Sequence, residues 1–179
     1  MLIYFMGVTL DIVGGSPKPS WVKISYSGVY DLHKVYRDIV AWFKFYHYFF
    51  NEKTHVEMIR PDGKTHKIDF KSDRKIDEYT KFIIEVEIWT IRTKEVSIKE
   101  NGKDVKMNTG DIQIRVKGAM ELDYYNIFDS YGKIGRVMRE YYHNYIIRDR
   151  IWRRYAPQIY NETNGLISSI KKDLGLVTN

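Results

Sequence analysis

The longest alternation of apolar and polar residues in this chain runs from residue 80 to residue 125 and predicts one long β-hairpin. Asn101-Gly102 lies near its centre, and this dipeptide tolerates the two positive φ angles of a type I′ turn. A two-residue turn fixes the pairing of the strands beside it, which places Ile98 opposite Val105.

Further from the turn, the apolar residues of the two strands stay on the same face of the hairpin only if one strand holds an extra residue. We expect Asn108-Thr109-Gly110 to hold this residue as a bulge. Beyond the bulge, Phe82 then lies opposite Leu122 and Ile88 opposite Val116. This part of the hairpin is expected to be core sheet.

The tip of the hairpin, residues 92–109, has a more polar composition. Thr90, Arg92 and Lys94 interrupt the apolar face, so the core should end near Ile88 or Trp89. The tip still carries a small apolar patch, which needs a cover. A second copy of the chain, another partner or the N-terminal strand could cover it, and self-association through residues 92–109 is therefore one hypothesis. The patch consists of Val96, Ile98, Val105 and Met107.

Two strands and a helix are expected before the hairpins. Met1 to Val13 is apolar and predicts a buried strand, and Trp21 to Tyr26 alternates as a second strand. Asp31 can cap the helix that follows. Apolar residues at three- and four-residue spacing give this helix one buried face. They are Leu32, Val35, Tyr36, Ile39, Trp42, Phe43 and Tyr46.

A shorter hairpin is expected about Pro61-Asp62-Gly63. A three-residue turn places Val56 opposite Ile68 on one face and His55 opposite Asp69 on the other. An outward pair of histidine and aspartate on a sheet is usually a surface contact, although it could also orient a general base.

The pattern becomes helical from Gly132 to Leu174. Steps of 100° per residue place ten apolar side chains on one stripe whose phase continues through Pro157. We therefore expect one long helix, kinked near this proline. The stripe consists of Ile134, Val137, Met138, Tyr141, Tyr145, Trp152, Tyr155, Ile159, Leu166 and Ile170.

Together these elements predict an α+β fold in one domain over residues 1–179. A curved antiparallel sheet of about six strands, with one long hairpin, is expected to be covered by the helix from Asp31 and the long kinked C-terminal helix.

This order of elements is similar to that of the helix-grip fold of the START-like superfamily. In that superfamily a curved antiparallel sheet wraps a long C-terminal helix, and an apolar cavity often lies between them. The resemblance covers nearly the whole chain and rests on element order. One long helix from Asp31 takes the place of the usual pair of short helices. The resemblance implies a carrier or sensor of an apolar or anionic small ligand, and it assigns no functional residue.

Composition narrows the possible chemistry. The chain has 179 residues, 44% hydrophobic and 29% charged, and no cysteine, which excludes disulfides and thiolate sites. The abundance of Lys, Arg, Ile, Glu and Tyr resembles that of thermophilic proteins. We expect no transmembrane segment, because the apolar N-terminal stretch is shorter than the roughly 20 residues that span a bilayer. A cytoplasmic location is the expectation.

The net charge of +6 is concentrated near the C-terminus. Residues 131–179 hold nine basic and four acidic side chains, which leaves 20 and 19 for residues 1–130. Opposite the apolar stripe, basic side chains form a second stripe that could bind phosphates, or could be a solvated face or pair with acidic residues of a second subunit. These candidate anion-binding residues are Arg136, Arg139, His143, Arg150, Arg153 and Arg154.

Arg148 is the exception, since its phase places it within the apolar stripe. A guanidinium there must extend outward, pair with a carboxylate or face a cavity that holds an anionic group. If a ligand pocket exists, Arg148 is the expected polar anchor. The expected walls are Trp42, Phe43, Tyr46, Phe70 and Trp152.

No arrangement of the five histidines or of the carboxylates matches a known catalytic or metal-binding spacing, and no cofactor is expected. An enzyme is the less favoured class. The favoured hypothesis is a non-enzymatic binding protein whose basic C-terminal helix contacts nucleic acid, a ribonucleoprotein or another polyanion. The alternatives are the small-ligand carrier and a structural protein that self-associates through the long hairpin.

Overall fold

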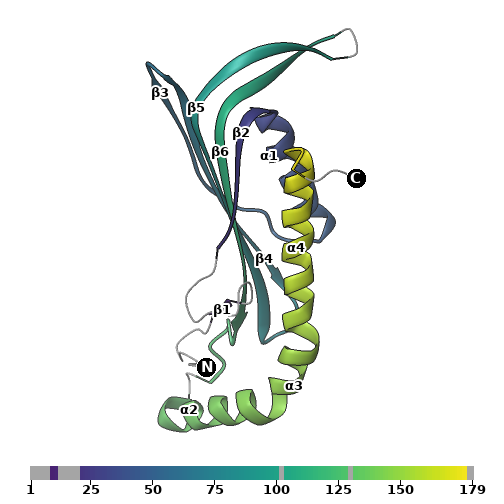
Figure 1. Ribbon diagram of the computed structural model, residues 1–179. Coiled ribbons are helices and arrows are strands. Elements are labelled where there is room, and N and C mark those ends of the chain that lie inside the picture. The colour runs from purple at the N-terminus through teal and green to yellow at the C-terminus, as the bar shows by residue number, and fades with distance from the viewer. Residues whose placement is uncertain (1–8, 12–20, 101–102, 129–130, 177–179) are drawn as a thin grey trace.

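The computed structural model describes residues 9–11, 21–100, 103–128 and 131–176 (Figure 1). The strands are β1 (Thr9–Asp11), β2 (Val22–Tyr30), β3 (Glu52–Arg60), β4 (Gly63–Lys75), β5 (Thr80–Glu100) and β6 (Lys103–Leu122). Helix α1 (Leu32–Phe45) follows β2, and a continuous helical segment follows β6. Most of the predicted strand Met1 to Val13 and the turn Asn101-Gly102 lie outside the described residues.

All strands form one antiparallel sheet in the order β1-β6-β5-β4-β3, with β2 also paired to β6. β1 pairs with residues 119–121 of β6 and β2 with residues 108–116 of the same edge. The sheet is therefore five strands wide, one fewer than expected, because β1 and β2 follow one another along a single edge. The α+β class, the curved antiparallel sheet and the long C-terminal helix are confirmed.

The long hairpin has the predicted pairing near its turn, where Ile98 lies opposite Val105. The predicted bulge is on the wrong strand. The extra residue belongs to β5, where Arg92 and Thr93 lie between two paired positions, Ile91 with Asp111 and Lys94 with Thr109. Phe82 consequently pairs with Met120, not with Leu122, and Ile88 with Ile114, not with Val116.

The bulge brings the backbone of β5 unusually close to both neighbouring strands. Arg92 has a positive φ of 55°, and its backbone approaches Gly63 of β4 and Gly110 of β6. A Cβ on Gly63 would lie 2.8 Å from the Arg92 carbonyl carbon, and one on Gly110 would lie 3.0 Å from the Arg92 carbonyl oxygen. The bulge lies on β5 because these glycines leave room for it there.

The short hairpin has a two-residue turn, Pro61-Asp62, and not the predicted three-residue turn. His55 therefore pairs with Ile68, and Val56 with Lys67. A shift of one residue moves every side chain of β3 to the other face, so the predicted pair of His55 and Asp69 is wrong. His55 Nδ1 instead lies 3.0 Å from Glu52 Oε1.

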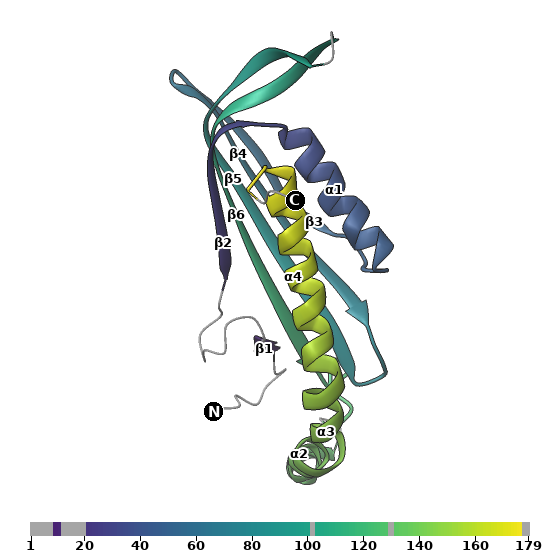
Figure 2. The same cartoon turned by 45° about the vertical axis from the view of Figure 1, so that its right-hand side comes forward.

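Helix α1 begins and packs as predicted. The side chain of Asp31 accepts a hydrogen bond of 2.9 Å from the Lys34 amide. Val35, Ile39 and Phe43 form its buried face. Helix α1 and the last helix lie side by side on the concave face of the sheet (Figure 2).

The C-terminal helical segment is continuous but does not have a uniform α-helical repeat. It comprises α2 (Gly132–Tyr141), the π-helical segment η2 (Tyr142–Ile147), α3 (Arg148–Arg150), the π-helical segment η3 (Ile151–Tyr155) and α4 (Ala156–Asp173). A buried side chain recurs every four residues through its centre, and the π-helical turns accommodate this spacing. The row consists of Ile147, Ile151, Tyr155, Ile159 and Thr163.

This four-residue repeat makes part of the predicted apolar stripe wrong. Tyr155, Ile159, Leu166 and Ile170 are buried as expected. The other predicted members lie N-terminal to Tyr155 and are exposed, because a 3.6-residue repeat and a four-residue repeat diverge as they are extended. The exposed members are Ile134, Val137, Met138, Tyr141, Tyr145 and Trp152.

The bend in the helix also lies upstream of its predicted position at Pro157. Figure 1 shows α2 running crosswise to α4, with the change of direction around α3. Pro157 is in the first turn of α4, directly after η3, so it lies on the C-terminal side of the bend. The two π-helical segments on either side of α3 account for the bend.

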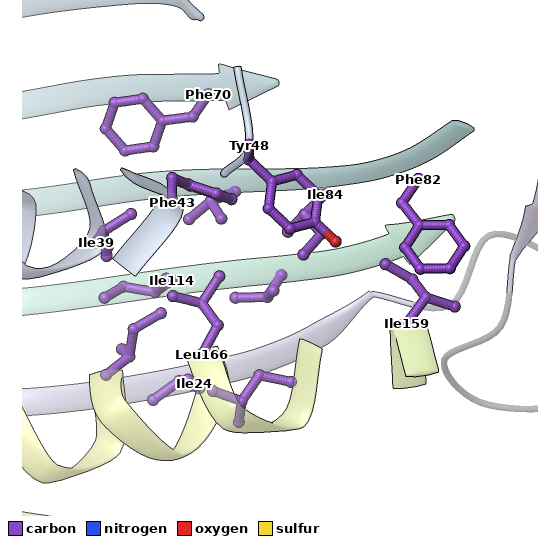
Figure 3. Close-up of a cluster of buried hydrophobic side chains, with 14 of the residues drawn as sticks. Ile24, Ile39, Phe43, Tyr48, Phe70, Phe82, Ile84, Ile114, Ile159 and Leu166 are labelled. Atoms are coloured by element: carbon purple, nitrogen blue, oxygen red, sulfur yellow. The ribbon is translucent and has the colours of Figure 1, made fainter. Parts of the chain in front are cut away.

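Figure 3 shows the centre of the core between the sheet and the two helices. Phe43 of α1, Phe82 of β5 and Ile159 of α4 are completely buried. Gly118 of β6 allows α4 to approach the sheet closely, because a Cβ there would overlap the Thr163 hydroxyl. This approach of α4 to the sheet thus depends on the absence of a side chain at residue 118.

We predict that Gly118→Ala destabilises the protein by about 1–3 kcal/mol through this overlap. Thr163→Ala removes the hydroxyl and methyl groups that the new Cβ would meet, so the double variant should be more stable than the sum of the two single effects predicts. Urea unfolding of the four proteins measures this coupling. Additive effects would show that the two residues do not meet.

Candidate functional site

The helical segment from Gly132 to Tyr155 forms an arm at one end of the molecule (Figure 1). Its inner side rests on three residues near the base of the long hairpin, Tyr79, Asp123 and Phe128, which we call the base residues. The rings of Tyr79 and Phe128 both pack against Tyr142, with centroid distances of 4.9 and 5.8 Å. The arm is therefore attached to the sheet by specific side-chain contacts.

Two of the predicted anion-binding residues are part of this attachment. Arg139 Nε lies 2.9 Å from Asp123 Oδ2, and the two side chains are only 12% and 4% exposed. His143 Nε2 and the Tyr79 hydroxyl share a hydrogen bond of 2.7 Å. The roles of Arg139 and His143 in the structure are thus to fix the arm, and neither faces solvent with the other arginines.

Titratable groups near the base residues have shifted pKa values. Burial raises the pKa of the Tyr79 phenol, and the Asp123 carboxylate adds to this effect. Burial also lowers the pKa of the His143 imidazole, with Asp123 opposing and Arg139 reinforcing the shift. His143 is therefore held neutral near pH 7.

The other four predicted anion-binding residues are exposed on the arm. They are Arg136, Arg150, Arg153 and Arg154. Arg153 forms an exposed ion pair of 2.7 Å with Asp149, and such a pair contributes little to stability. Within the described part of the chain, Arg136 and Arg154 form no ion pair.

Arg148 is exposed, so its predicted position within a buried apolar stripe is wrong. It points away from the core because the four-residue repeat buries Ile147 and Ile151 on either side of it. Arg148 thereby joins the exposed arginines of the arm. These four basic side chains, from Arg148 to Arg154, lie within two turns of helix.

The structure divides the six residues of the predicted ligand pocket between two places. Phe43 and Phe70 lie in the core, joined by Phe50 at ring distances of 6.0 and 5.2 Å. The rings of Trp42 and Tyr46 contact each other in a tilted arrangement, with centroids 4.3 Å apart, and both residues are half-buried. The remaining two, Arg148 and Trp152, are exposed on the arm.

A shallow open depression lies elsewhere, beside the turn between β3 and β4 and the bulge of β5. None of the six predicted pocket residues lines it. Its lining residues are Ile59, Arg60, Gly63, Lys64, Thr93, Lys94 and Glu95.

The sequence pattern did not reveal the exposed apolar face of the arm. This face carries both aliphatic and aromatic side chains, and its exposed fractions range from 46% for Met138 to 76% for Tyr145. The rings of Tyr141 and Tyr145 stack at 5.1 Å. The six residues of this apolar face are Ile134, Val137, Met138, Tyr141, Tyr145 and Ile146.

A signal for this face was present in the sequence. Gly135, Arg139, His143, Ile147 and Ile151 are spaced four residues apart, and all five residues are buried or half-buried. Counting apolar residues alone hides this row, because three of its first members are glycine, arginine and histidine. A helix with this repeat turns the apolar face outward.

The chain matches no protein-family model and no curated protein. In the described residues, no helix is both long enough and apolar enough to cross a membrane. The described histidines, aspartates and glutamates include no group of three that could hold a metal ion.

We predict that Gly135→Ala destabilises the arm, because its Cβ would overlap the backbone carbonyl of Phe128, which cannot move like a flexible side chain. Gly165→Ala in α4 is the matched control, since no atom outside the neighbouring backbone of its own helix lies within 4 Å of its added Cβ. The control should gain about 0.5–1 kcal/mol from higher helix propensity. Thermal unfolding compares the two variants, and equal effects of the same sign would contradict the close approach of Gly135.

We also predict that His143 makes stability fall in mild acid. Because the folded protein lowers the His143 pKa, the unfolded chain takes up the proton first as the pH falls below the ordinary value of 6.5. Stability is then lost progressively. His66, whose pKa is also lowered by burial, contributes to the same trend.

Comparison of the wild type with His143→Gln isolates the contribution of His143, because His66 is present in both proteins. The urea midpoint of the variant should fall less between about pH 8 and about pH 5.5. Parallel pH profiles of the two proteins would show that His143 is not buried as described.

Proposed function

We propose that this protein is a non-enzymatic binding protein whose arm, residues 132–155, docks on an anionic surface. The observation that carries the proposal is the gathering of exposed basic side chains on one short helical segment. The arm has seven basic and two acidic residues. Five arginines of the arm are exposed and can be reached by an anion: Arg136, Arg148, Arg150, Arg153 and Arg154.

The attachment of the arm supports this proposal. The partners of Arg139 and Tyr142 at the base residues hold the helix in one position, so the arginines are presented without a large loss of backbone entropy on binding. Arginine donates two parallel hydrogen bonds to a phosphate, which suits a surface that carries many phosphate groups.

Basic residues elsewhere on the surface differ from those of the arm in their partners. The outer face of the sheet also carries basic residues, but many of these are paired with carboxylates. Lys71 pairs with Glu85, Lys81 with Glu121, and Arg115 with Glu87. Their charge is largely cancelled at short range, so the arm is the stronger site for an anion.

Removal of three arm charges should weaken binding to an anionic surface on the order of a hundredfold at low salt, since each Lys or Arg near such a surface contributes about 1 kcal/mol. The variant is Arg136→Ala/Arg148→Ala/Arg154→Ala, and all three side chains are exposed and unpaired in the described part of the chain. Its matched control is Lys44→Ala/Lys53→Ala/Arg60→Ala, which removes three exposed charges from α1 and β3.

The measurement uses single-stranded RNA, duplex DNA and phosphatidylserine-containing vesicles, each at low and high salt. Binding to at least one of them should fall with salt and with the arm variant, and should persist in the control. The proposal would be wrong if the wild-type protein bound none of the three at low salt. It would also be wrong if the two triple variants weakened binding equally.

A further inference from the structure

Anion binding by the exposed arginines does not account for the apolar face of the arm. Within the four-residue repeat, Val137, Tyr141 and Tyr145 lie opposite the buried row, and Ile134, Met138 and Ile146 lie beside them. All six side chains are between 46% and 76% exposed. A continuous apolar face of this kind marks a surface that binds something apolar.

The chemistry of this face distinguishes between anionic partners. Single-stranded nucleic acid is bound by aromatic stacking, to which aliphatic side chains contribute little. Four of the six residues are aliphatic: Ile134, Val137, Met138 and Ile146. A helix with an exposed aliphatic and aromatic face, and with basic side chains beside this face and further along the helix, is suited to the interface of a lipid bilayer.

The position of the arm is also suited to a planar surface. Helix α2 runs crosswise at the end of the molecule, so the side of α2 and η2 that faces away from the sheet can lie along a plane (Figures 1 and 2). Tyr131, directly before the arm, is 59% exposed, and Trp152 of the arm is 48% exposed. Tyrosine and tryptophan favour the headgroup region, where the ring is buried and the polar atom stays hydrated.

The charges of the arm indicate whether an anionic or a zwitterionic lipid bilayer would bind it. Lys133 and Arg136 lie beside the apolar face, and Arg148 and Arg154 follow it along the helix. Their long side chains can cover apolar surface while the charged groups reach the lipid phosphates. Glu140 and Asp149 are the acidic residues of the arm, so its net charge favours an anionic surface over a zwitterionic one.

We propose that the arm binds the surface of an anionic lipid bilayer, with the apolar face of residues 134–146 at the boundary between headgroups and acyl chains and the arginines on the headgroup phosphates. This inference rests on the proposed function and specifies its partner. The protein would lie on the membrane as a peripheral protein, held by apolar burial and charge together.

The test is flotation of the full chain with two kinds of vesicle, phosphatidylcholine alone and phosphatidylcholine mixed with phosphatidylserine. The apolar variant is Ile134→Gln/Val137→Gln/Tyr141→Gln. The matched control, Phe45→Gln/Phe49→Gln/Ile59→Gln, removes three apolar side chains of similar exposure, 71–79%, from elsewhere on the surface. Circular dichroism and thermal unfolding verify that both variants are folded.

The wild type and the control should bind the phosphatidylserine vesicles and not the neutral ones, and the apolar variant should bind at least about tenfold more weakly. Equal binding by the apolar variant and the control would overturn the inference, because charge alone would then explain the interaction. Binding of the wild type to RNA or DNA without binding to vesicles would overturn it too, and would leave the proposed function intact.

Two further outcomes also decide between the alternatives. If the wild type binds neither vesicles nor nucleic acid at low salt, both the inference and the proposed function fail. If it binds no vesicles but forms a dimer by light scattering that the apolar variant abolishes, a second copy of the chain covers the apolar face and the membrane inference is wrong.

Discussion

The four-residue repeat of buried positions in the C-terminal helical segment is the constraint on which the rest of this structure depends. The segment follows a long twisted sheet and must place a side chain against it at nearly every turn from Ile147 to Thr163. A regular α-helix drifts by about 40° for each four-residue step. The π-helical segments η2 and η3 absorb this drift, and they thereby set the direction of everything N-terminal to them.

A polar cluster fixes where along the sheet this helix lies. Arg74 of β4 donates hydrogen bonds of 2.7 and 2.8 Å to the two carboxylate oxygens of Glu162 in α4, and one of 2.6 Å to the Tyr46 carbonyl. The Tyr48 hydroxyl donates to the same carboxylate at 2.7 Å. Loss of one partner from such a mostly buried ion pair costs about 3–5 kcal/mol.

The cluster therefore connects three parts of the chain that are distant in sequence. The Arg74 guanidinium also lies over the ring of Tyr48, at 4.6 Å from its centroid. Burial, together with the Glu162 carboxylate, raises the pKa of Tyr48, which keeps its hydroxyl protonated as a donor. Glu162 is the sequence neighbour of Thr163, which belongs to the row of buried positions. The cluster therefore sets the register of α4 against β4.

The elements that sequence reasoning predicted well are those whose signals are local. Asp31 caps α1 because the cap depends on a few neighbouring residues. In the long hairpin, the bulge lies on the other strand, but the error shifts each pair by two residues and leaves each side chain on its predicted face. The error in the short hairpin is one residue, so His55 and Val56 change faces.

The candidate site was harder to predict, because its form depends on contacts between distant segments. The arginines were found from helical periodicity, and Arg150, Arg153 and Arg154 are exposed as expected. Arg139 is not, because Asp123, at the base of the long hairpin, pairs with it. No local sequence pattern indicates this ion pair. Nor does one indicate how the π-helical segments change the direction in which Arg148 points from the helix.

The same contacts explain why the apolar face of the arm stays exposed instead of folding onto the sheet. Because the helical segment is continuous, a rotation that buried Val137 and Tyr141 would also turn Ile147 and Ile151 outward, at a cost of about 1.5–3 kcal/mol for each. It would also leave the Asp123 carboxylate buried without its arginine, at about 3–5 kcal/mol more.

The outward direction of the apolar face is thus a consequence of how the inner side of the arm is held. Substitutions of the apolar face should leave the fold intact, since its side chains are 46% to 76% exposed, whereas changes at Asp123 or Gly135 should move the face itself. The side of the helix that stabilises the fold and the side proposed to bind a surface are thus opposite, separated by about two residues in sequence.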